Sequence, residues 1–351
     1  MSLPGGVANY YNILQLANSE NISYFFVNKA KPQSIPGTIS RLLVNYVRFI
    51  YITISKKYRI IHINPSLDYK SFYRDAIFII ISRILQKKIL IFFRGWLEEY
   101  EQTIKGNKFK SWLFKISYAK ANKYIVLSKL FKKKLLELGV SKNTEFFIET
   151  TVADTTYLSG FKLEKKIECY QEKINFLFLS RILKEKGIYI AIDSFEQFLK
   201  RFPDKQASLT IAGDGPELTQ VKEYVTEKKL SGIIFTGYIT GEMKKKVFYQ
   251  SHVLLLPSYS EGMPNVILEA MLYGMPIISR ITGAIPDIIQ QNVNGFLTES
   301  LRPEIFSEFL SLIATDSNLY KKIAENNFKM ASEKFVCQKV KERILKIYAT
   351  F

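Results

Sequence analysis

Glu261 and Glu269 are the two residues whose type and spacing point most directly to ligand chemistry. Glu261 stands in a Ser-Tyr-Ser-Glu-Gly loop, and Glu269 follows it by eight residues. A carboxylate accepts two hydrogen bonds, which suits a ribose diol or the hydroxyls of a sugar ring. Between the two, an expected helix start offers the backbone N–H groups of Gly262, Met263, Asn265 and Val266. Free N–H groups at a helix start hold anionic oxygens and hydroxyls. The simpler alternative is that both glutamates are ordinary acids of a helix.

The residues around these glutamates predict one strand–loop–helix–strand unit. Residues 253–256 are a short apolar run, typical of a buried parallel strand, and Pro257 ends it. Residues 265–273 have the pattern of a helix, which Gly274 ends before a second strand at residues 277–279. The loop with Glu261 therefore lies at the carboxyl end of a strand, where open α/β sheets bind ligands.

Two earlier strand ends carry residues suited to a diphosphate. The strand expected at residues 174–179 is followed by Arg181 and Lys186, two cations at a strand's carboxyl end. The strand at residues 208–212 ends in Gly213, which permits a tight turn at the crevice. A basic loop and a plain turn are the alternatives.

The first half of the chain supplies weaker candidates. A strand at residues 89–93 ends in Arg94, which can stabilise a departing phosphate or clamp an anionic acceptor but cannot serve as a base. Gly5 and Gly6 precede an expected helix at residues 7–17, and a glycine pair lets backbone approach a phosphate or an acceptor closely. A plain turn is the alternative for that pair.

Five further segments complete the expected organisation. Residues 22–27 and residues 60–63, which include His62, are interpreted as strands. Residues 106–123 form an expected basic and aromatic helix, and residues 154–173 are interpreted as an interdomain linker. Residues 335–351 have the pattern of an amphipathic helix.

The segment SEGMPNVILEAM and the GMPIISRITGAIPDII that follows resemble the donor-binding segment of the retaining glycosyltransferases of family 4. The resemblance is strong over residues 181–297 and thin before residue 154. It departs from the family at Arg94, because relatives often carry a histidine there, near the reacting sugar carbon.

The resemblance implies an α/β protein of the GT-B fold, with two Rossmann-like domains whose parallel sheets face a central cleft. Residues 1–165 would form an acceptor-binding domain whose first strand is short or missing. Residues 166–335 would form the nucleotide-sugar-binding domain. Residues 336–351 would form a C-terminal helix that returns to the first domain.

The resemblance also implies a reaction. A sugar would move, with retention of configuration, from a UDP- or GDP-sugar to a glycan acceptor in capsule, O-antigen or exopolysaccharide synthesis. Arg181 and Lys186 would hold the diphosphate in place of a metal ion, so no metal and no further cofactor are expected. Glu261 would hold donor-sugar hydroxyls and Glu269 the ribose, and Tyr238 stands where relatives place the nucleotide base. The leaving phosphate would accept the acceptor's proton.

The net charge of +18 lies almost entirely in the first half of the chain. Residues 1–165 carry 26 Lys/Arg and 11 Asp/Glu, a net of +15, and residues 166–351 carry 24 and 21, a net of +3. Such a bias suits an anionic membrane surface, and with it a lipid-linked acceptor. A solvated basic face is the alternative. Nucleic acid would explain the charge as well, but no RRM, KH or helix-turn-helix signature accompanies it, so no nucleic-acid partner is expected.

The remaining composition is ordinary for a globular protein. Cys169 and Cys337 provide neither a disulfide framework nor a metal-ligand spacing. No secretory signal pattern opens the chain and no apolar run reaches the length of a membrane span, so a cytoplasmic protein at the inner face of the plasma membrane is expected. Two alternatives to the enzyme remain: a catalytically inactive GT-B partner subunit and a basic nucleic-acid-binding protein on a Rossmann-like scaffold.

Overall fold

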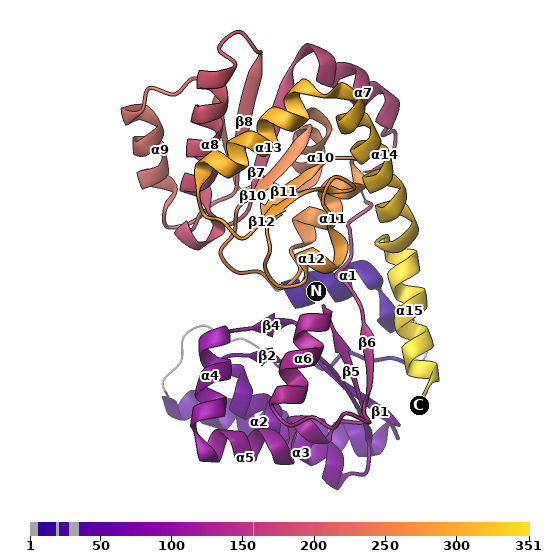
Figure 1. The fold of residues 1–351 in the computed structure, drawn as a ribbon. Helices are drawn as coiled ribbons and strands as arrows, with labels where there is room; N and C mark the ends of the chain where they lie inside the picture. The colour runs from indigo at the N-terminus through magenta and orange to yellow at the C-terminus, as the bar shows by residue number, and fades with distance from the viewer. Residues whose placement is uncertain (1–5, 19–20, 28–34, 157) are drawn as a thin grey trace. The chain divides into compact units, whose positions relative to one another are not determined.

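The structure of the chain is a computed structural model that describes residues 6–18, 21–27, 35–156 and 158–351. The chain separates into two compact units, each built on a parallel sheet (Figure 1). Unit 1 comprises Met1–Thr150 and Lys341–Phe351, and unit 2 comprises Thr151–Val340.

Unit 1 contains a four-stranded parallel sheet with the strand order β1-β3-β5-β6. Its strands are β1 (Ile60–Ile63), β3 (Lys88–Phe92), β5 (Lys123–Val126) and β6 (Glu145–Ile148). A small second sheet pairs β2 (Ser66–Leu67) with β4 (Gly95–Trp96). The helices described in this unit are α1 (Gly6–Leu14), η1 (Leu16–Asn18), α2 (Ile35–Ser55), α3 (Ser71–Ile84), α4 (Glu98–Gly106), α5 (Lys108–Ile116), η2 (Tyr118–Lys120) and α6 (Lys129–Glu137).

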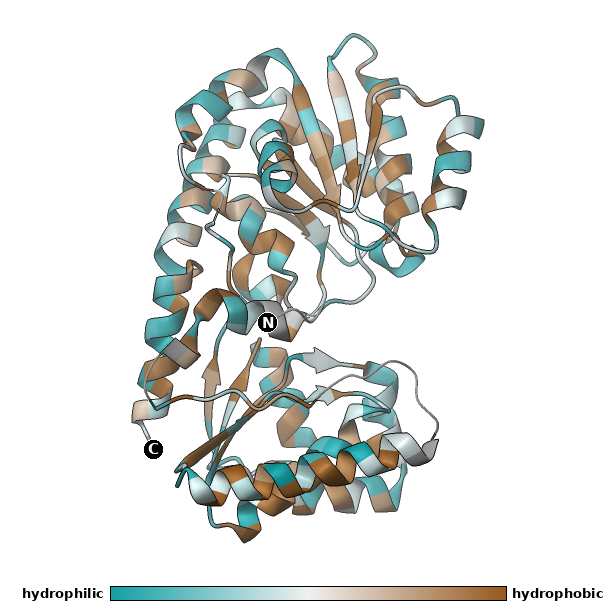
Figure 2. Ribbon diagram, turned by 180° about the vertical axis from the view of Figure 1, so that it is seen from behind, coloured by the Kyte–Doolittle hydropathy of each residue, from teal (hydrophilic) through white to brown (hydrophobic). Residues whose placement is uncertain are grey.

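The strands of both sheets are apolar because helices cover them (Figure 2). In β3, for example, every residue from Ile89 to Phe92 is buried, whereas Lys88 at its start is exposed. The run of apolar residues at a strand position is therefore what allowed most strands to be predicted.

Residues 22–27 do not form a strand, so the prediction of one there was wrong. Phe25 instead packs against a cluster of Phe49, Ile61 and Phe78. The apolar pattern of this segment reflects the burial of its side chains, and burial alone does not pair a backbone with a neighbouring strand.

The single helix predicted at residues 106–123 was also wrong, because the chain breaks at Asn107 and again at Ser117. Asn107 ends α4, and its side chain accepts a hydrogen bond from the backbone N–H of Lys110 at 3.0 Å. Asparagine is a favourable N-cap residue, so Asn107 starts the new helix α5 instead of continuing α4.

Helix α15 (Cys337–Ala349) begins in unit 2, and its later turns belong to unit 1. There the Tyr348 hydroxyl lies 2.7 Å from His62 Nδ1. Arg343 Nε donates to both carboxylate oxygens of Glu149, at 3.0 and 2.9 Å. These contacts attach the end of the chain to β1 and to the residue that follows β6.

Unit 2 contains a six-stranded parallel sheet with the strand order β12-β11-β10-β7-β8-β9. Its strands are β7 (Ile174–Leu179), β8 (Ala207–Ala212), β9 (Ile233–Gly237), β10 (Val253–Leu256), β11 (Ile277–Arg280) and β12 (Gly295–Thr298). Its helices are α7 (Leu163–Glu172), η3 (Lys184–Lys186), α8 (Ile188–Arg201), α9 (Leu218–Glu227), α10 (Gly241–Gln250), α11 (Asn265–Leu272), α12 (Ile285–Ile288), α13 (Pro303–Thr315) and α14 (Ser317–Lys334).

The strand order of unit 2 contains a reversal. From β7 the chain builds the sheet outward through β8 to β9, and it then returns to the other side of β7 to add β10, β11 and β12. The carboxyl ends of β7 and β10 therefore flank a topological switch point, where open α/β sheets bind their ligands.

The linker predicted at residues 154–173 was wrong over most of its second half, where α7 forms. Leu163, Lys166 and Tyr170 recur at helical spacing and are all buried. A buried lysine in the middle of this set made the segment look like a solvated stretch, because lysine is almost never fully buried.

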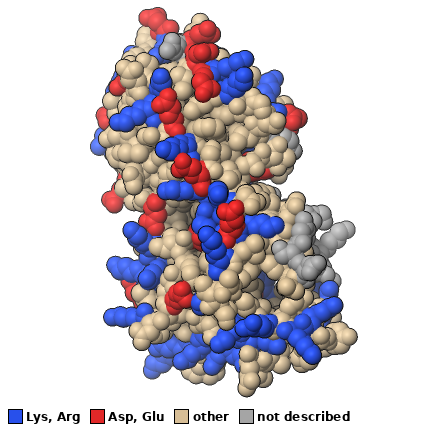
Figure 3. All heavy atoms as spheres, turned by 90° about the vertical axis from the view of Figure 1, so that its right-hand side faces the viewer, with Lys and Arg blue, Asp and Glu red and all other residues tan. Residues whose placement is uncertain are grey.

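The surface of unit 1 shows the expected basic bias. Blue side chains gather along the lower margin of this unit in Figure 3, whereas both signs of charge alternate on unit 2. Within the part of the chain that the structure describes, no helix is both long and apolar enough to cross a bilayer.

Candidate functional site

The candidate site lies in unit 2, at the carboxyl ends of β7 and β10. Lys186 follows β7, and its Nζ lies 2.6 Å from Glu261 Oε1 in the loop after β10. Both side chains are largely sheltered, with 23% of Lys186 and 11% of Glu261 exposed. The structure therefore brings together two predicted site residues that are 75 positions apart in the sequence.

Backbone contacts hold these two loops together. The N–H of Tyr259 donates to the carbonyl oxygen of Glu185 at 2.8 Å. Gly187 has φ +76°, and a Cβ there would lie 2.1 Å from the carbonyl oxygen of Pro257. Glycine is needed at this position both for its left-handed conformation and for the close approach of the two chains.

Arg181 lies in the same loop as Lys186 but is exposed. Within the described residues it has no carboxylate partner. Its guanidinium is therefore free to bind an anion, whereas the ammonium of Lys186 is already paired with Glu261.

Gly213 belongs to the neighbouring loop, after β8. Its φ is +144°, and a Cβ there would lie 1.9 Å from the carbonyl oxygen of Ser180. The N–H of Gly213 donates to the carbonyl oxygen of Gly237, at the end of β9, at 2.8 Å. Tyr238 follows directly and is 77% exposed, so its ring is open to solvent at the same edge of the sheet.

The helix start between the two glutamates forms as predicted. Pro264 is the N-cap of α11, in an extended conformation and without a side-chain cap. Gly262 and Met263 precede it, and Asn265 and Val266 are the first residues of the helix. The backbone N–H groups at this helix start therefore have no side-chain cap from Pro264. The loop is held from the other side, because the N–H of Ala284 donates to the carbonyl oxygen of Gly262 at 2.7 Å.

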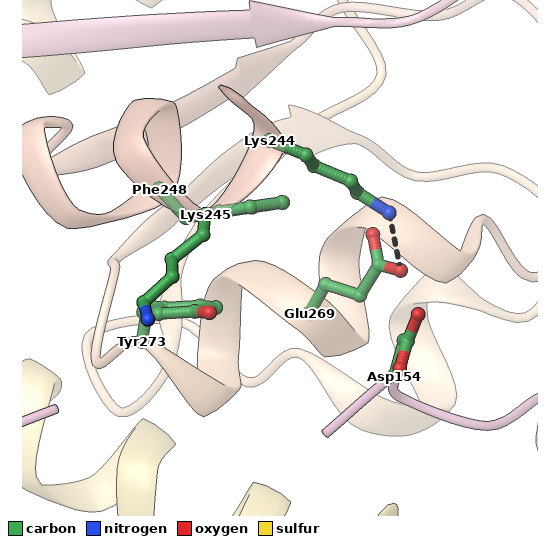
Figure 4. A pocket seen from close by; sticks show the side chains of 6 residues that line it. All are labelled: Asp154, Lys244, Lys245, Phe248, Glu269 and Tyr273. Carbon is green, nitrogen blue, oxygen red and sulfur yellow. Dashed lines mark hydrogen bonds and ion pairs between the residues drawn. The ribbon is translucent and has the colours of Figure 1, made fainter. Parts of the chain in front are cut away.

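Glu269 is buried, and its carboxylate meets Lys244 of α10, whose Nζ lies 2.7 Å from Oε1. The two side chains help to line a small pocket, in which the carboxylate of Asp154 lies on the far side of Glu269 from Lys244 (Figure 4). The other lining residues are Lys245, Phe248 and Tyr273.

Lys244 and Asp154 were missed in the sequence. Lys244 stands 25 positions before Glu269, in a run of three lysines that looks like a solvated helix face. Asp154 lies in a segment that was interpreted as linker. No motif in the neighbouring sequence marks either residue, because each comes to lie at the pocket only through the packing of unit 2.

Arg94 lies in unit 1, directly after β3. Its guanidinium stacks over two rings, 4.0 Å from the centre of Tyr10 and 4.6 Å from that of Phe92. Burial lowers the pKa of Arg94. Within the described residues its Nη1 atom is buried without a hydrogen-bond partner. A buried cation with an unused donor is costly, and it is typical of a site that a ligand completes.

His62, on the adjacent strand β1, is neutral at physiological pH. Burial, with a further effect from the positive charge of Arg94, lowers its pKa to about 3. Its Nδ1 pairs with Tyr348, and its Nε2 is buried without a partner among the described residues. The lowered pKa and the contact with Tyr348 both indicate that His62 is a neutral ring that orients its neighbours, not an acid that donates a proton.

The amino-terminal glycine pair is described only in part. Gly6 is the first residue of α1, and Gly5 lies outside the described residues. The helix itself is anchored, because the Tyr11 hydroxyl donates to Asn64 Oδ1 at 2.7 Å, just after β1. Among the residues described, no group of three or more His, Cys, Asp or Glu side chains is placed to hold a metal ion.

Comparison with known proteins supports the relationship that the site suggests. Residues 161–330, all within unit 2, match the family model described as glycosyl transferases group 1. An uncharacterized glycosyltransferase of Methanocaldococcus jannaschii is 26% identical over 193 residues, 51% of this chain and 49% of that protein. The capsular polysaccharide biosynthesis glycosyltransferase CapM of Staphylococcus aureus is 26% identical over 267 residues, 71% of this chain and 68% of that protein. The chain thus spans about half to two thirds of the length of these curated relatives.

Solved structures share the fold of nearly the whole chain. Anabaena Alr3699/HepE in complex with UDP-glucose has a TM-score of 0.70 at 18% identity, over 91% of this chain and 84% of that chain. A glycosyltransferase from Rickettsia africae has a TM-score of 0.67 at 16% identity, over 98% and 87%. The fold is therefore GT-B, and the predicted fold class is confirmed. The match to group 1 glycosyl transferases concerns residues 161–330 of unit 2, whereas the likeness of fold extends over both units.

Proposed function

We propose that this protein is a glycosyltransferase that moves a sugar from a UDP- or GDP-sugar to a glycan acceptor. The observation that carries the proposal is the contact between Lys186 and Glu261 at the switch point of unit 2. It puts a cation suited to a diphosphate beside a carboxylate suited to sugar hydroxyls. The complex of the structural neighbour HepE with UDP-glucose supports a donor of this class.

The roles of the site residues follow from their charge and position. Arg181 and Lys186 would neutralise the charge that develops on the diphosphate as its bond to the sugar breaks. Because these two cations supply positive charge at that point, we propose that transfer needs no metal ion. Glu261 would bind hydroxyls of the donor sugar, Glu269 would bind the ribose, and the exposed ring of Tyr238 would lie beside the base.

A retaining reaction of the family 4 type fits a site of this kind. The carboxylate of Glu261 is paired with the ammonium of Lys186, so it is poorly placed to act as a general base. The leaving phosphate would therefore take the proton of the acceptor hydroxyl, on the face from which it departs. The new bond would then form on that same face, with retention of configuration.

We further propose that unit 1 receives the acceptor, with Arg94 as its anion-binding residue. The unused donor of Arg94 suits a phosphate or carboxylate group. The basic charge of unit 1 and the capsular relative CapM favour a lipid-linked acceptor at the inner face of the plasma membrane. The comparisons do not favour an inactive partner subunit or a nucleic-acid-binding protein.

The test is hydrolysis of a panel of UDP- and GDP-sugars by the purified protein, with and without EDTA. We expect one donor to be turned over slowly and the chelator to change the rate little. Lys186→Ala should lower that rate about 100-fold or more, because it removes a charge that acts mainly in the transition state. Glu269→Ala should weaken donor binding.

Lys184→Ala is the matched control, since Lys184 is an exposed lysine in the same short helix. Its donor hydrolysis should equal that of the wild type. If no donor is bound or cleaved, even when membrane extract supplies acceptors, the enzyme proposal is wrong. A rate that EDTA abolishes would refute the metal-independent mechanism alone.

A further inference from the structure

Helix α2 of unit 1 exposes a continuous row of large apolar side chains. Their exposed fractions range from 55% to 70%, so each is mainly in solvent. The residues of this α2 stripe are Ile39, Leu43, Val44, Val47, Tyr51 and Ile54. Soluble proteins seldom expose so many large apolar residues on one element, and such patches mark interaction surfaces.

The spacing of the α2 stripe makes it one face of the helix. At about 100° per residue, its six members fall within a sector of roughly 140°. Asn45, Phe49 and Thr53 are buried and fall on the opposite side, where Phe49 joins the core of unit 1. The long helix at the bottom of Figure 2 alternates brown with teal and white along its length, as an amphipathic helix does. The stripe is therefore directed away from the core, and it runs from Ile39 to Ile54 within a helix of 21 residues.

Positive charge borders the stripe. Arg48 is exposed at the edge of the stripe, at about 180° from Ile39 on the helical wheel, where the stripe itself ends at about 140°. Lys56, Lys57 and Arg59 follow the end of the helix. The helix itself contains no acidic residue. Over residues 21–97 the sequence has 13 Lys/Arg and only two Asp/Glu, of which Asp75 is buried and paired with Arg74.

The neighbouring helices also carry exposed apolar side chains. α3 packs against both α2 and α5. It exposes Tyr73, Ile77 and Ile84, and α5 exposes Phe109 and Trp112 among its lysines. Aromatic rings between lysines are typical of a surface that lies at the boundary between water and lipid.

We propose that the α2 stripe docks unit 1 on an anionic lipid bilayer, with α2 lying in the plane of the interface. The apolar side chains would enter the region between headgroups and acyl chains, while Arg48 and the lysines that follow α2 contact anionic headgroups. This identifies the surface for the membrane partner, and in that respect it rests on the proposed function. A second copy of the chain is a poorer occupant, because two such basic faces would repel each other.

The test is co-sedimentation of the full-length protein with vesicles. We expect binding to vesicles of phosphatidylcholine and phosphatidylglycerol, little binding to phosphatidylcholine alone, and weaker binding at high salt. Val47→Glu with Tyr51→Glu should lower binding to the anionic vesicles about tenfold or more, because two charges would enter the apolar face. Lys56→Glu with Lys57→Glu should lower it as well.

Leu312→Glu is the matched control. Leu312 is an apolar residue of α13 in unit 2 with 47% of its surface exposed, so its variant should bind vesicles as the wild type does. Circular dichroism verifies folding, and Val47→Ser with Ile54→Ser replaces the acidic pair if that pair unfolds unit 1. Unchanged vesicle binding by a folded stripe variant would refute the proposal. So would a wild-type dimer that the stripe variants convert to a monomer.

Donor hydrolysis without vesicles separates this proposal from the proposed function. The stripe variants should hydrolyse the donor at the wild-type rate, since the donor residues lie in unit 2. If the protein binds anionic vesicles through α2 but cleaves no donor, the docking proposal is supported and the enzyme proposal is refuted. If it cleaves a donor but binds no vesicles, the enzyme proposal is supported and the docking proposal is refuted.

Discussion

Lys244 and Lys245 are adjacent on α10, yet their ion pairs differ in the burial of the acid. Lys244 Nζ lies 2.7 Å from Glu269, whose side chain is 6% exposed. Lys245 Nζ lies 3.7 Å from Glu242, whose side chain is 77% exposed. The first pair therefore shelters a carboxylate that has little water to solvate it, and the second is a surface pair.

We predict that Lys244→Ala lowers the free energy of unfolding by about 1–3 kcal/mol, because the buried carboxylate of Glu269 loses its partner. Lys245→Ala should change it by about 0.5 kcal/mol or less. Urea unfolding followed by circular dichroism measures both. Equal effects of the two substitutions would show that burial does not distinguish these pairs.

At the scale of elements, the site depends on how closely the loops after β7 and β10 approach each other. Gly187 is the point of closest approach, with φ +76° and no space for a Cβ. Gly106 offers a contrast, because it ends α4 and a Cβ there would meet nothing within 4 Å.

We predict that Gly187→Ala lowers the free energy of unfolding by about 2 kcal/mol or more, from backbone strain and the clash with Pro257. It should also lower donor hydrolysis, because the loop that carries Lys186 would shift from Glu261. Gly106→Ala should be neutral or stabilising by up to about 1 kcal/mol. Thermal unfolding and the donor assay measure the two effects, and a stable, active Gly187→Ala variant would contradict the close approach.

At the scale of the whole molecule, each unit contains one histidine whose pKa is lowered by burial of its ring, and stability should fall in acid. Burial, with a further effect from the charge of Lys166, lowers the pKa of His252 from 6.5 to about 3. His62 of unit 1 has the same shift. Below pH 6.5 the unfolded chain binds a proton that the folded chain does not. The contribution of each neutral histidine to the free energy of unfolding is therefore fully present above pH 6.5 and is lost as the pH falls toward 3.

We predict that lowering the pH from 7 to 5 costs about 2 kcal/mol per histidine. His252→Asn removes one titrating group and keeps an acceptor for the N–H of Asn175, which donates to His252 Nδ1 at 3.0 Å. Its melting temperature should therefore fall less between pH 7 and pH 5 than that of the wild type. An identical fall in both proteins would exclude His252 as a source of the acid sensitivity.

Much of the fold could be predicted from local patterns. The strands expected at residues 174–179 and 253–256 form with those bounds, as β7 and β10, because each is a short apolar run bounded by turn residues. The strand at residues 22–27 failed because an apolar run does not specify a pairing partner. The segment of α7 was mistaken for a linker because a buried lysine hid its periodicity.

The sequence by itself determined that unit 2 would carry a strand-end loop with Glu261, a helix with Glu269, and two cations after an earlier strand. Each follows from residues that are close together in the chain. Only the tertiary structure decided that Lys186 pairs with Glu261 and Lys244 with Glu269, and that the apolar face of α2 remains exposed. The physical reason is that strand order and helix packing set these distances, and both depend on the burial of the whole chain rather than on any local window.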